Sequence, residues 1–179
     1  MRKLFLFVMT ALVVASLAAA PLTPAQKSSV ETQVKQFSVL GTDPVVVKAV
    51  KDYIAAPPAE LKGMTQEIWT KMSVLSTEIK YLTRNPLAVY LKTKKTEIMA
   101  ELFVSAPNGE KVALFSKTTS WSHKGKAKHE VPMTGKTWIG EPELDESTGK
   151  QSVQFSFPVM DGSRVIGSIV IGLDLSLLK

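Results

Sequence analysis

Residues 98–115, IMAELFVSAPNGEKVALF, and residues 153–175, VQFSFPVMDGSRVIGSIVIGLDL, contain the pattern that decides the fold. Apolar side chains recur at every second position in both stretches, a period that is typical of β-strands. A turn dipeptide divides each stretch, Asn108-Gly109 in the first and Asp161-Gly162 in the second. In the first turn we expect both residues to adopt positive φ, as a tight two-residue hairpin requires. Each stretch is therefore predicted to form an antiparallel hairpin.

The second hairpin indicates which side chains share a face. Its first strand carries an apolar row that no polar side chain interrupts, and we expect this row to face a layer of helices. The row consists of Val153, Phe155, Phe157 and Val159. Gln154 and Ser156 then face the opposite side. Residues 165–175 are apolar on both faces and are predicted to form a central strand.

Two shorter elements complete the predicted sheet, which extends over residues 97–178. Residues 137–139 are predicted to form a short strand, and residues 145–149 a polar hairpin tip. Together with the two hairpins, the short strand gives a five-stranded antiparallel sheet. A single lysine follows Leu178, so we expect no output module after the sheet.

The residues before the sheet are predicted to be helical, because apolar side chains recur there every three or four positions. They are Val30, Val34, Phe37 and Leu40 in a first helix, Val46, Val47, Val50 and Ile54 in a second, and Ile68, Met72, Leu75, Ile79 and Leu82 in a third. Gly41 is predicted to end the first helix, Asp43 to cap the second and Thr65 to cap the third. Helices over residues 26–95 followed by an antiparallel sheet make one α+β domain over residues 26–179.

Residues 1–25 have the features of a secretory signal peptide. Two basic residues precede an apolar run at residues 4–17, and small residues follow it. Cleavage after Ala20 fits the small-residue pattern but would place the disfavoured Pro21 directly after the cut, and cleavage after Ala18 or Ala25 avoids this. An uncleaved membrane anchor is the alternative, although the apolar run is short for a bilayer crossing. We therefore predict an exported protein, and its lack of cysteine suits a periplasmic location.

The composition and the motifs exclude several classes of function. The chain has no cysteine, which excludes disulfides, thiolate metal sites and a cysteine nucleophile. It has two histidines, His123 and His129, with no second cluster of ligands beside them, so no metal site is predicted. No hydrolase, metalloprotease or phosphate-binding motif is present, and we expect neither enzymatic activity nor a cofactor. The formal net charge of +6 comes without a nucleic-acid-binding motif, so no nucleic-acid partner is expected.

Residues 117–136 form a long connection between predicted strands. A loop of this length in a compact domain is usually functional or disordered. Only Glu130 opposes its five lysines, which are Lys117, Lys124, Lys126, Lys128 and Lys136. Two interpretations are open. The segment is either a solvated loop or an electropositive rim that attracts a small anion.

The order of these elements resembles the Cache (or PDC) superfamily, the extracellular PAS-like sensor domains of bacterial receptors. The matching segments are ELFV at 101–104, NGEKVA at 108–113, WIG at 138–140, FPVMDG at 157–162 and VIG at 165–167, and residues 169–175 correspond to the closing strand. The resemblance covers residues 30–178 and includes stand-alone secreted members. It implies a long N-terminal helix packed on a five-stranded antiparallel sheet. Residues 121–126 are basic where related stand-alone domains are acidic, so the ligand of those relatives is not carried over.

The resemblance also implies a place for a ligand, because Cache ligands lie between the open face of the sheet and the long loop. The residues predicted to bind it are Trp121, His123, Lys126, Lys128, Trp138, Gln154 and Ser156. Structural packing is the alternative role for both tryptophans. We expect Lys126 and Lys128 to contact a carboxylate, and if the ligand is a cation, Asp174 or Glu101 would supply the counter-charge.

The predicted function is therefore a periplasmic sensor domain for a small organic ligand. Because it has no output module of its own, we expect it to act through a partner such as a membrane receptor. The alternative is a structural or interaction module of the cell envelope that binds no small ligand.

Overall fold

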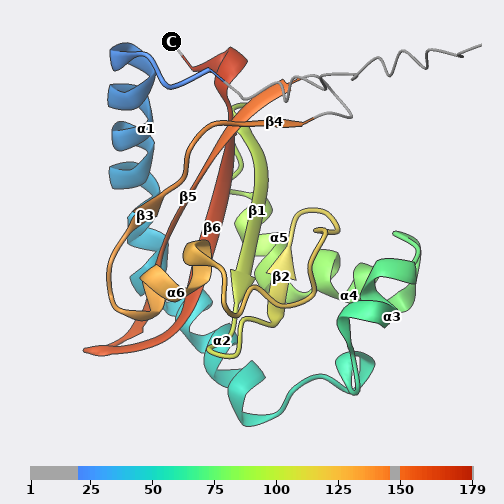
Figure 1. Cartoon of the computed structure of the whole chain (residues 1–179). Helices are drawn as coiled ribbons and strands as arrows, with labels where there is room; N and C mark the ends of the chain where they lie inside the picture. The colour runs from blue at the N-terminus through green and yellow to red at the C-terminus, as the bar shows by residue number, and fades with distance from the viewer. Residues whose placement is uncertain (1–19, 146–149, 179) are drawn as a thin grey trace, which may run out of the picture.

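The computed structural model describes residues 20–145 and 150–178 of the chain, with helices first and an antiparallel sheet after them (Figure 1). The helices are α1 (Pro24–Phe37), α2 (Pro44–Ala55), α3 (Gln66–Lys71), α4 (Thr77–Arg84), α5 (Pro86–Lys92) and α6 (Ala127–Met133), with short 3-10 helices η1 (Ser38–Thr42), η2 (Ala59–Leu61) and η3 (Leu175–Leu177). The strands are β1 (Met99–Ser105), β2 (Lys111–Leu114), β3 (Trp138–Ile139), β4 (Glu143–Asp145), β5 (Lys150–Asp161) and β6 (Arg164–Asp174). The predicted α+β class is confirmed. The predicted signal peptide up to residue 19 and the hairpin tip at residues 146–149 lie outside the described residues.

The sheet is antiparallel throughout, with the strand order β2-β1-β6-β5-β3 and with β4 paired to β5. Strand β6 lies in the middle of this order, as its two apolar faces predicted. Over residues 20–145 and 150–178 the sheet has six strands instead of the expected five. The additional strand is β4, where Glu143 pairs with Ser152 of β5, and its three residues are too few for alternation to indicate a strand.

The turn between β1 and β2 differs from the predicted one. Only Gly109 adopts a positive φ, of 79°, and no described residue other than glycine does so; the expectation for Asn108 was therefore wrong. The Gly109 N–H donates to the Ala106 carbonyl, and the Ala106 N–H donates to the Glu110 carbonyl, both at 2.9 Å. Pro107 explains the difference, because its fixed φ near −65° suits the first central position of an ordinary type I turn.

The predicted third helix is in fact two helices, α3 and α4, separated by residues 72–76. In this break the Ser73 hydroxyl accepts a hydrogen bond from the Leu75 N–H at 3.1 Å, and the Ser76 hydroxyl caps α4 by accepting from the Ile79 N–H at 3.4 Å. Serine side chains that bond to neighbouring backbone groups compete with continuation of a helix. Leu75 is 72% exposed, so the continuous apolar face predicted from the periodicity was wrong.

Three predictions about helix ends have different outcomes. Asp43 caps α2 and Thr65 caps α3, as predicted. Gly41 does not end the first helix, since α1 ends at Phe37 and η1 follows it. A Cβ atom at Gly41 would lie 2.2 Å from the carbonyl oxygen of Pro158 in β5. The glycine is therefore needed because it allows η1 to approach the sheet closely.

The two faces of the sheet have different covers (Figure 1). On one face η1 and α2 pack against the apolar row of β5, which is fully buried as predicted; its members are Val153, Phe155, Phe157 and Val159. On the opposite face lies the segment 117–136, which contains α6 and packs on β5 and β6. This segment thus covers the sheet and has regular structure of its own. Within residues 20–145 and 150–178, no helix combines the length and the hydropathy that a membrane crossing needs.

Candidate functional site

A cleft of about 550 Å³ lies on the face of the sheet that α6 covers. Strands β1 and β5 supply its floor, and β4, α6 and the residues before α6 supply its walls. The lining residues are Glu101, Ser152 and Gln154 on the floor, and Lys117, Thr118, Thr119, His123, Lys128, Glu143 and Leu144 on the walls. This is the place where the resemblance implied a ligand, between the open face and the long loop.

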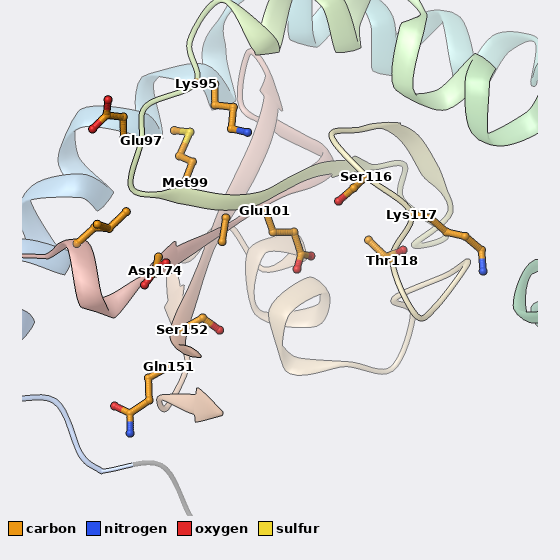
Figure 2. Close-up of a pocket in the computed structure, with 12 residues that line it drawn as sticks. Lys95, Glu97, Met99, Glu101, Ser116, Lys117, Thr118, Gln151, Ser152 and Asp174 are labelled. Atoms are coloured by element: carbon orange, nitrogen blue, oxygen red, sulfur yellow. The ribbon is translucent and has the colours of Figure 1, made fainter. Parts of the chain in front are cut away.

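A second cleft, of about 470 Å³, continues the first one along β1 (Figure 2). The two clefts share Glu101, Lys117, Thr118 and Ser152. Figure 2 shows Glu101 on β1 between Lys117 and Thr118 on one side and Asp174 on the other. Glu101 therefore occupies the junction of one continuous groove.

A chain of polar contacts crosses the floor of the cleft. Gln154 of β5 and Glu101 of β1 both pair with Gly172 of the strand between them, and the Gln154 amide donates to the Glu101 carboxylate at 3.3 Å. A side chain at position 172 would meet both, since a Cβ there would lie 3.1 Å from the Glu101 Cβ and 3.7 Å from the Gln154 Cγ. The Lys128 ammonium donates to the Gln154 carbonyl oxygen from above. Burial raises the pKa of Glu101, while Lys128 and Lys111 oppose that shift.

Beside this chain lies a fully buried lysine. Lys111 of β2 has no solvent exposure, and its Nζ contacts the Nδ1 of His123 and lies 3.4 Å from the Ser105 hydroxyl. The same Nζ lies 3.9 Å from the centre of the Phe103 ring, which also stacks on His123 with 4.7 Å between ring centroids. Among the described residues no carboxylate forms an ion pair with Lys111. Burial lowers the pKa of Lys111 well below its ordinary value, because a buried ammonium without a counter-ion is costly.

His123 connects the buried lysine to the cleft. It is 4% exposed and lines the cleft wall. Burial, followed by the positive charge of Lys111, lowers the pKa of His123 to about 2. The ring is therefore neutral at ordinary pH, with one nitrogen as a hydrogen-bond donor and the other as a hydrogen-bond acceptor.

The other histidine, His129, holds α6 on the sheet. It is buried, and its Nδ1 lies 2.8 Å from the Ser168 hydroxyl of β6 while its Nε2 lies 3.2 Å from the Pro107 carbonyl. Burial lowers the pKa of His129. This residue does not line the cleft, and its contacts give it the role of anchoring the helix that carries Lys128.

Helix α3 fixes the wall of the cleft at residues 117–121. The Trp69 indole N–H donates to the Thr118 carbonyl at 2.7 Å. The Gln66 amide donates to the Thr119 carbonyl at 3.0 Å and accepts from the Trp121 N–H at 2.8 Å. Trp121 also packs on Trp69, with ring centroids 5.4 Å apart. The wall is thus attached to the helical part of the molecule through a few specific contacts.

The structure brings together some of the residues predicted to bind a ligand. His123, Lys128 and Gln154 line the cleft. The remaining four do not: Trp121 packs on Trp69, Lys126 is exposed at the start of α6, Trp138 lies on β3, and Ser156 is buried. Among the residues that the structure describes, the Ser156 hydroxyl has no hydrogen-bond partner. For Trp121 the structure therefore supports the packing role that was the alternative.

Sequence reasoning missed several side chains that shape the cleft. Lys111 and Glu101 were assigned to strands, and only Glu101 was considered, as a counter-charge for a cationic ligand. One signal was available for Lys111, because a lysine beside the apolar residues 112–114 of a short strand has no polar face to occupy. Within the part of the chain that the structure describes, no three His, Asp or Glu side chains converge to hold a metal ion.

The charges around the cleft are nearly balanced. Two carboxylates, Glu101 and Glu143, and two lysines, Lys117 and Lys128, line it. The hydroxyls of Thr118, Thr119 and Ser152 add hydrogen-bonding groups without charge. Such a lining can hold a small polar molecule through a few specific contacts.

Comparison with solved structures shows the fold. The sensor domain of the V. cholerae histidine kinase DctB matches with a TM-score of 0.50 and 14% identity, over 84% of this chain and 52% of that domain. The E. coli DcuS sensor domain matches with a TM-score of 0.49 and 13% identity, over 86% of this chain and 94% of that chain. The ligand-binding domain of the Pseudomonas aeruginosa PAO1 amino acid chemoreceptor PctC, in complex with GABA, matches with a TM-score of 0.41 and 13% identity, over 83% and 62% of the two chains.

The chain thus has the fold of Cache-type sensor domains, and the resemblance seen in the sequence is confirmed at this level. It spans about half the length of the DctB sensor domain. No protein-family model matches the chain, and no curated protein matches it.

Proposed function

We propose that this protein, which has a Cache-type sensor fold, binds a small organic molecule in the cleft between α6 and the sheet. The observation that carries the proposal is the cleft itself. It has the size of small-molecule sites, about 550 Å³, and polar side chains from four separate segments of the chain converge on it. The fold is shared with the sensor domain of the histidine kinase DctB, and this supports a sensor role for the present chain.

The ligand we propose carries a carboxylate. Lys128 and Lys117 supply positive charge on the walls, and Thr119 supplies a hydroxyl donor beside them. Hydrogen bonds from charged groups contribute about 1.5–3 kcal/mol each, more than neutral ones do. Glu101 and Glu143 balance the lysines, so a ligand that also carries a hydrogen-bond donor or a positive group fits the lining better than a highly charged anion.

A thermal-shift screen tests the proposed function. The panel contains monocarboxylates and dicarboxylates, amino acids, amines and their uncharged amides. A compound that binds only the folded state stabilises it by RT ln(1 + [L]/Kd), about 2.7 kcal/mol at one hundred times Kd. We expect carboxylates to raise the midpoint and their amides to leave it unchanged. Silence across the panel, with retention of an envelope protein on the immobilised domain, would instead support an interaction module.

We further propose that the domain is exported and acts through a membrane receptor. The predicted signal peptide supports export, and the capping box at the start of α1 indicates where processing would have to stop. There the Thr23 hydroxyl accepts from the Gln26 N–H at 3.2 Å, and the Gln26 side chain accepts from the Thr23 N–H at 3.0 Å. Cleavage after Ala25 would remove this cap and cleavage after Ala20 would leave Pro21 at the new N-terminus, so we expect cleavage after Ala18. Mass spectrometry of the protein from a periplasmic extract would measure the site.

A further inference from the structure

Lys111 and His123 form a contact that packing alone does not explain. Lysine is the side chain least suited to a position with no exposure, and an apolar residue would fill the same space without losing hydration. Its amine makes two polar contacts, with Ser105 and with His123. The second of these partners is a residue of the cleft wall.

The direction of the hydrogen bond decides what His123 presents to the cleft. An amine that donates to Nδ1 requires Nδ1 to be unprotonated, which places the single ring proton on Nε2. Nε2 has no partner among the described residues, and the ring itself is held in place by its stacking on Phe103. With the hydrogen bond in this direction, Nε2–H is the donor that His123, a residue of the cleft wall, has available for a ligand.

We infer that Lys111 and His123 act together as an anion-recognition pair, in which a carboxylate accepts a hydrogen bond from His123 Nε2 and its binding draws one proton from solvent into the pair. This inference rests on the proposed function and specifies how that site selects its ligand. The proton comes from the buffer, and no bond other than N–H is formed.

The charges around the pair explain why the proton enters only with the anion. On β1, Glu101 lies near Lys111 and favours its protonation, but the Glu101 carboxylate also interacts with Lys128 and Gln154. From α6, Lys128, Lys126 and His129 oppose a positive charge on His123, as Lys111 itself does. Burial opposes it further. A bound carboxylate adds the negative charge that this environment lacks.

The experiment uses propionate as the probe and propionamide as its uncharged counterpart of equal size. Nitrogen-15 NMR of the histidine rings in the free protein should show His123 neutral, with its proton on Nε2, and saturating propionate should shift both ring nitrogens. Calorimetry in two buffers of different ionisation enthalpy should show uptake of about one proton per propionate near pH 7. The affinity should then fall up to tenfold for each unit of rising pH.

Two variants separate this pair from general electrostatics. In Lys111→Met the proton uptake should disappear and the propionate affinity should fall at least tenfold. Lys126→Met makes the same substitution at an exposed position outside the cleft, and it should keep both the uptake and the affinity within about twofold.

Three results would overturn the inference. They are binding of propionate without proton uptake, uptake that persists in Lys111→Met, and His123 carrying its proton on Nδ1 in the free protein. If propionate leaves the ring nitrogens unchanged while an amine or an amide stabilises the protein, the recognition pair is refuted and the proposed small-molecule function stands. If nothing in the panel binds, both are refuted.

Discussion

The two faces of the sheet place opposite chemistry on neighbouring side chains of the same strand. On β5, Phe155 points into the helical layer with no exposed surface, and the preceding residue, Gln154, points into the cleft and bonds to Glu101 and Lys128. The face that η1 and α2 cover (the helix-covered face) is buried and apolar. The cleft face contains buried polar groups, among them Lys111, whose burial costs free energy.

The difference indicates that one face of the sheet provides stability and the other provides the candidate binding site. Burial of apolar area stabilises the fold by about 25 cal/mol per Å², and the helix-covered face supplies this term. The cleft face holds a lysine, a glutamate and a histidine whose pKa values burial shifts away from their ordinary values. Clusters of shifted pKa values in a cleft are typical of functional sites. Substitutions on the two faces should therefore have different, and partly opposite, effects.

The largest effect is expected on the helix-covered face. Phe155→Ala removes a fully buried ring that stacks near Phe157, with 6.1 Å between centroids, and leaves a cavity. Large-to-small changes of this kind cost about 3–5 kcal/mol of unfolding free energy. Urea unfolding would measure the loss. Ligand affinity, measured where the variant is folded, should change less than twofold, and a large loss of affinity would refute the separation of the faces.

A smaller effect, on binding instead of stability, is expected from Lys128→Gln. The change removes the charge that lies over the Gln154 carbonyl oxygen at the cleft. Loss of one charge-assisted contact should weaken carboxylate binding about 10- to 100-fold, since each 1.4 kcal/mol is a factor of ten. Titration calorimetry would measure it. Unchanged affinity would mean that the ligand does not reach α6.

The third prediction concerns Lys111→Met, which should stabilise the fold, whereas Phe155→Ala should destabilise it. Lys111→Met should raise the unfolding free energy by about 1–3 kcal/mol at pH 7, because it replaces a buried amine with an apolar side chain of similar length. Thermal or urea unfolding would show the gain. A destabilised variant would mean that the amine is a necessary part of the core packing, and not a cost that the cleft imposes.

The pH dependence of this gain follows from the direction of the pKa shift. The folded-state pKa of Lys111 lies below its unfolded value, so the unfolded state binds more protons, and wild-type stability falls as the pH falls below about 10. The gain from Lys111→Met should therefore be larger at pH 7 than at pH 10. His123, with a pKa lowered to about 2, should cause a further loss of stability below about pH 6.5 in both proteins. Unfolding curves at four pH values would separate the two groups.

The smallest effect is expected for Lys126→Gln, a lysine of the same segment that lies outside the cleft. Affinity should fall slightly at low salt and recover at high salt, because the contribution of an exposed charge is screened. Stability should change by less than about 0.5 kcal/mol. A salt-independent loss comparable with that of Lys128→Gln would place the ligand at the exposed side of α6.

The sequence was sufficient to predict the strands of the two hairpins, because alternation of apolar and polar residues reflects which side chains are buried. The apolar row of β5 and the two-sided apolar β6 both lie where their patterns predicted. It was insufficient for β4, whose pairing depends on the neighbouring strand and not on its own residues. It also failed for the predicted helix through residue 75, where serine hydroxyls bond to the backbone and divide the helix.

The candidate site was less predictable than the fold, because it depends on side chains that meet only in three dimensions. Lys126 and Lys128 are lysines of the same short segment, yet the start of α6 brings Lys128 to the cleft and leaves Lys126 in solvent. Glu101 and Gln154 are more than fifty positions apart in sequence and meet across Gly172. Nothing local in the sequence marks such a pair.

The contact between Trp69 and Trp121 makes the state of the cleft optically visible. One indole belongs to α3, and the other to the wall segment that carries Lys117, Thr118 and Thr119. Both indoles are buried. Any outward movement of the wall separates the rings and admits water, which shifts tryptophan emission to longer wavelength. The tryptophan emission of the unlabelled protein therefore reports whether the wall segment stays packed against α3.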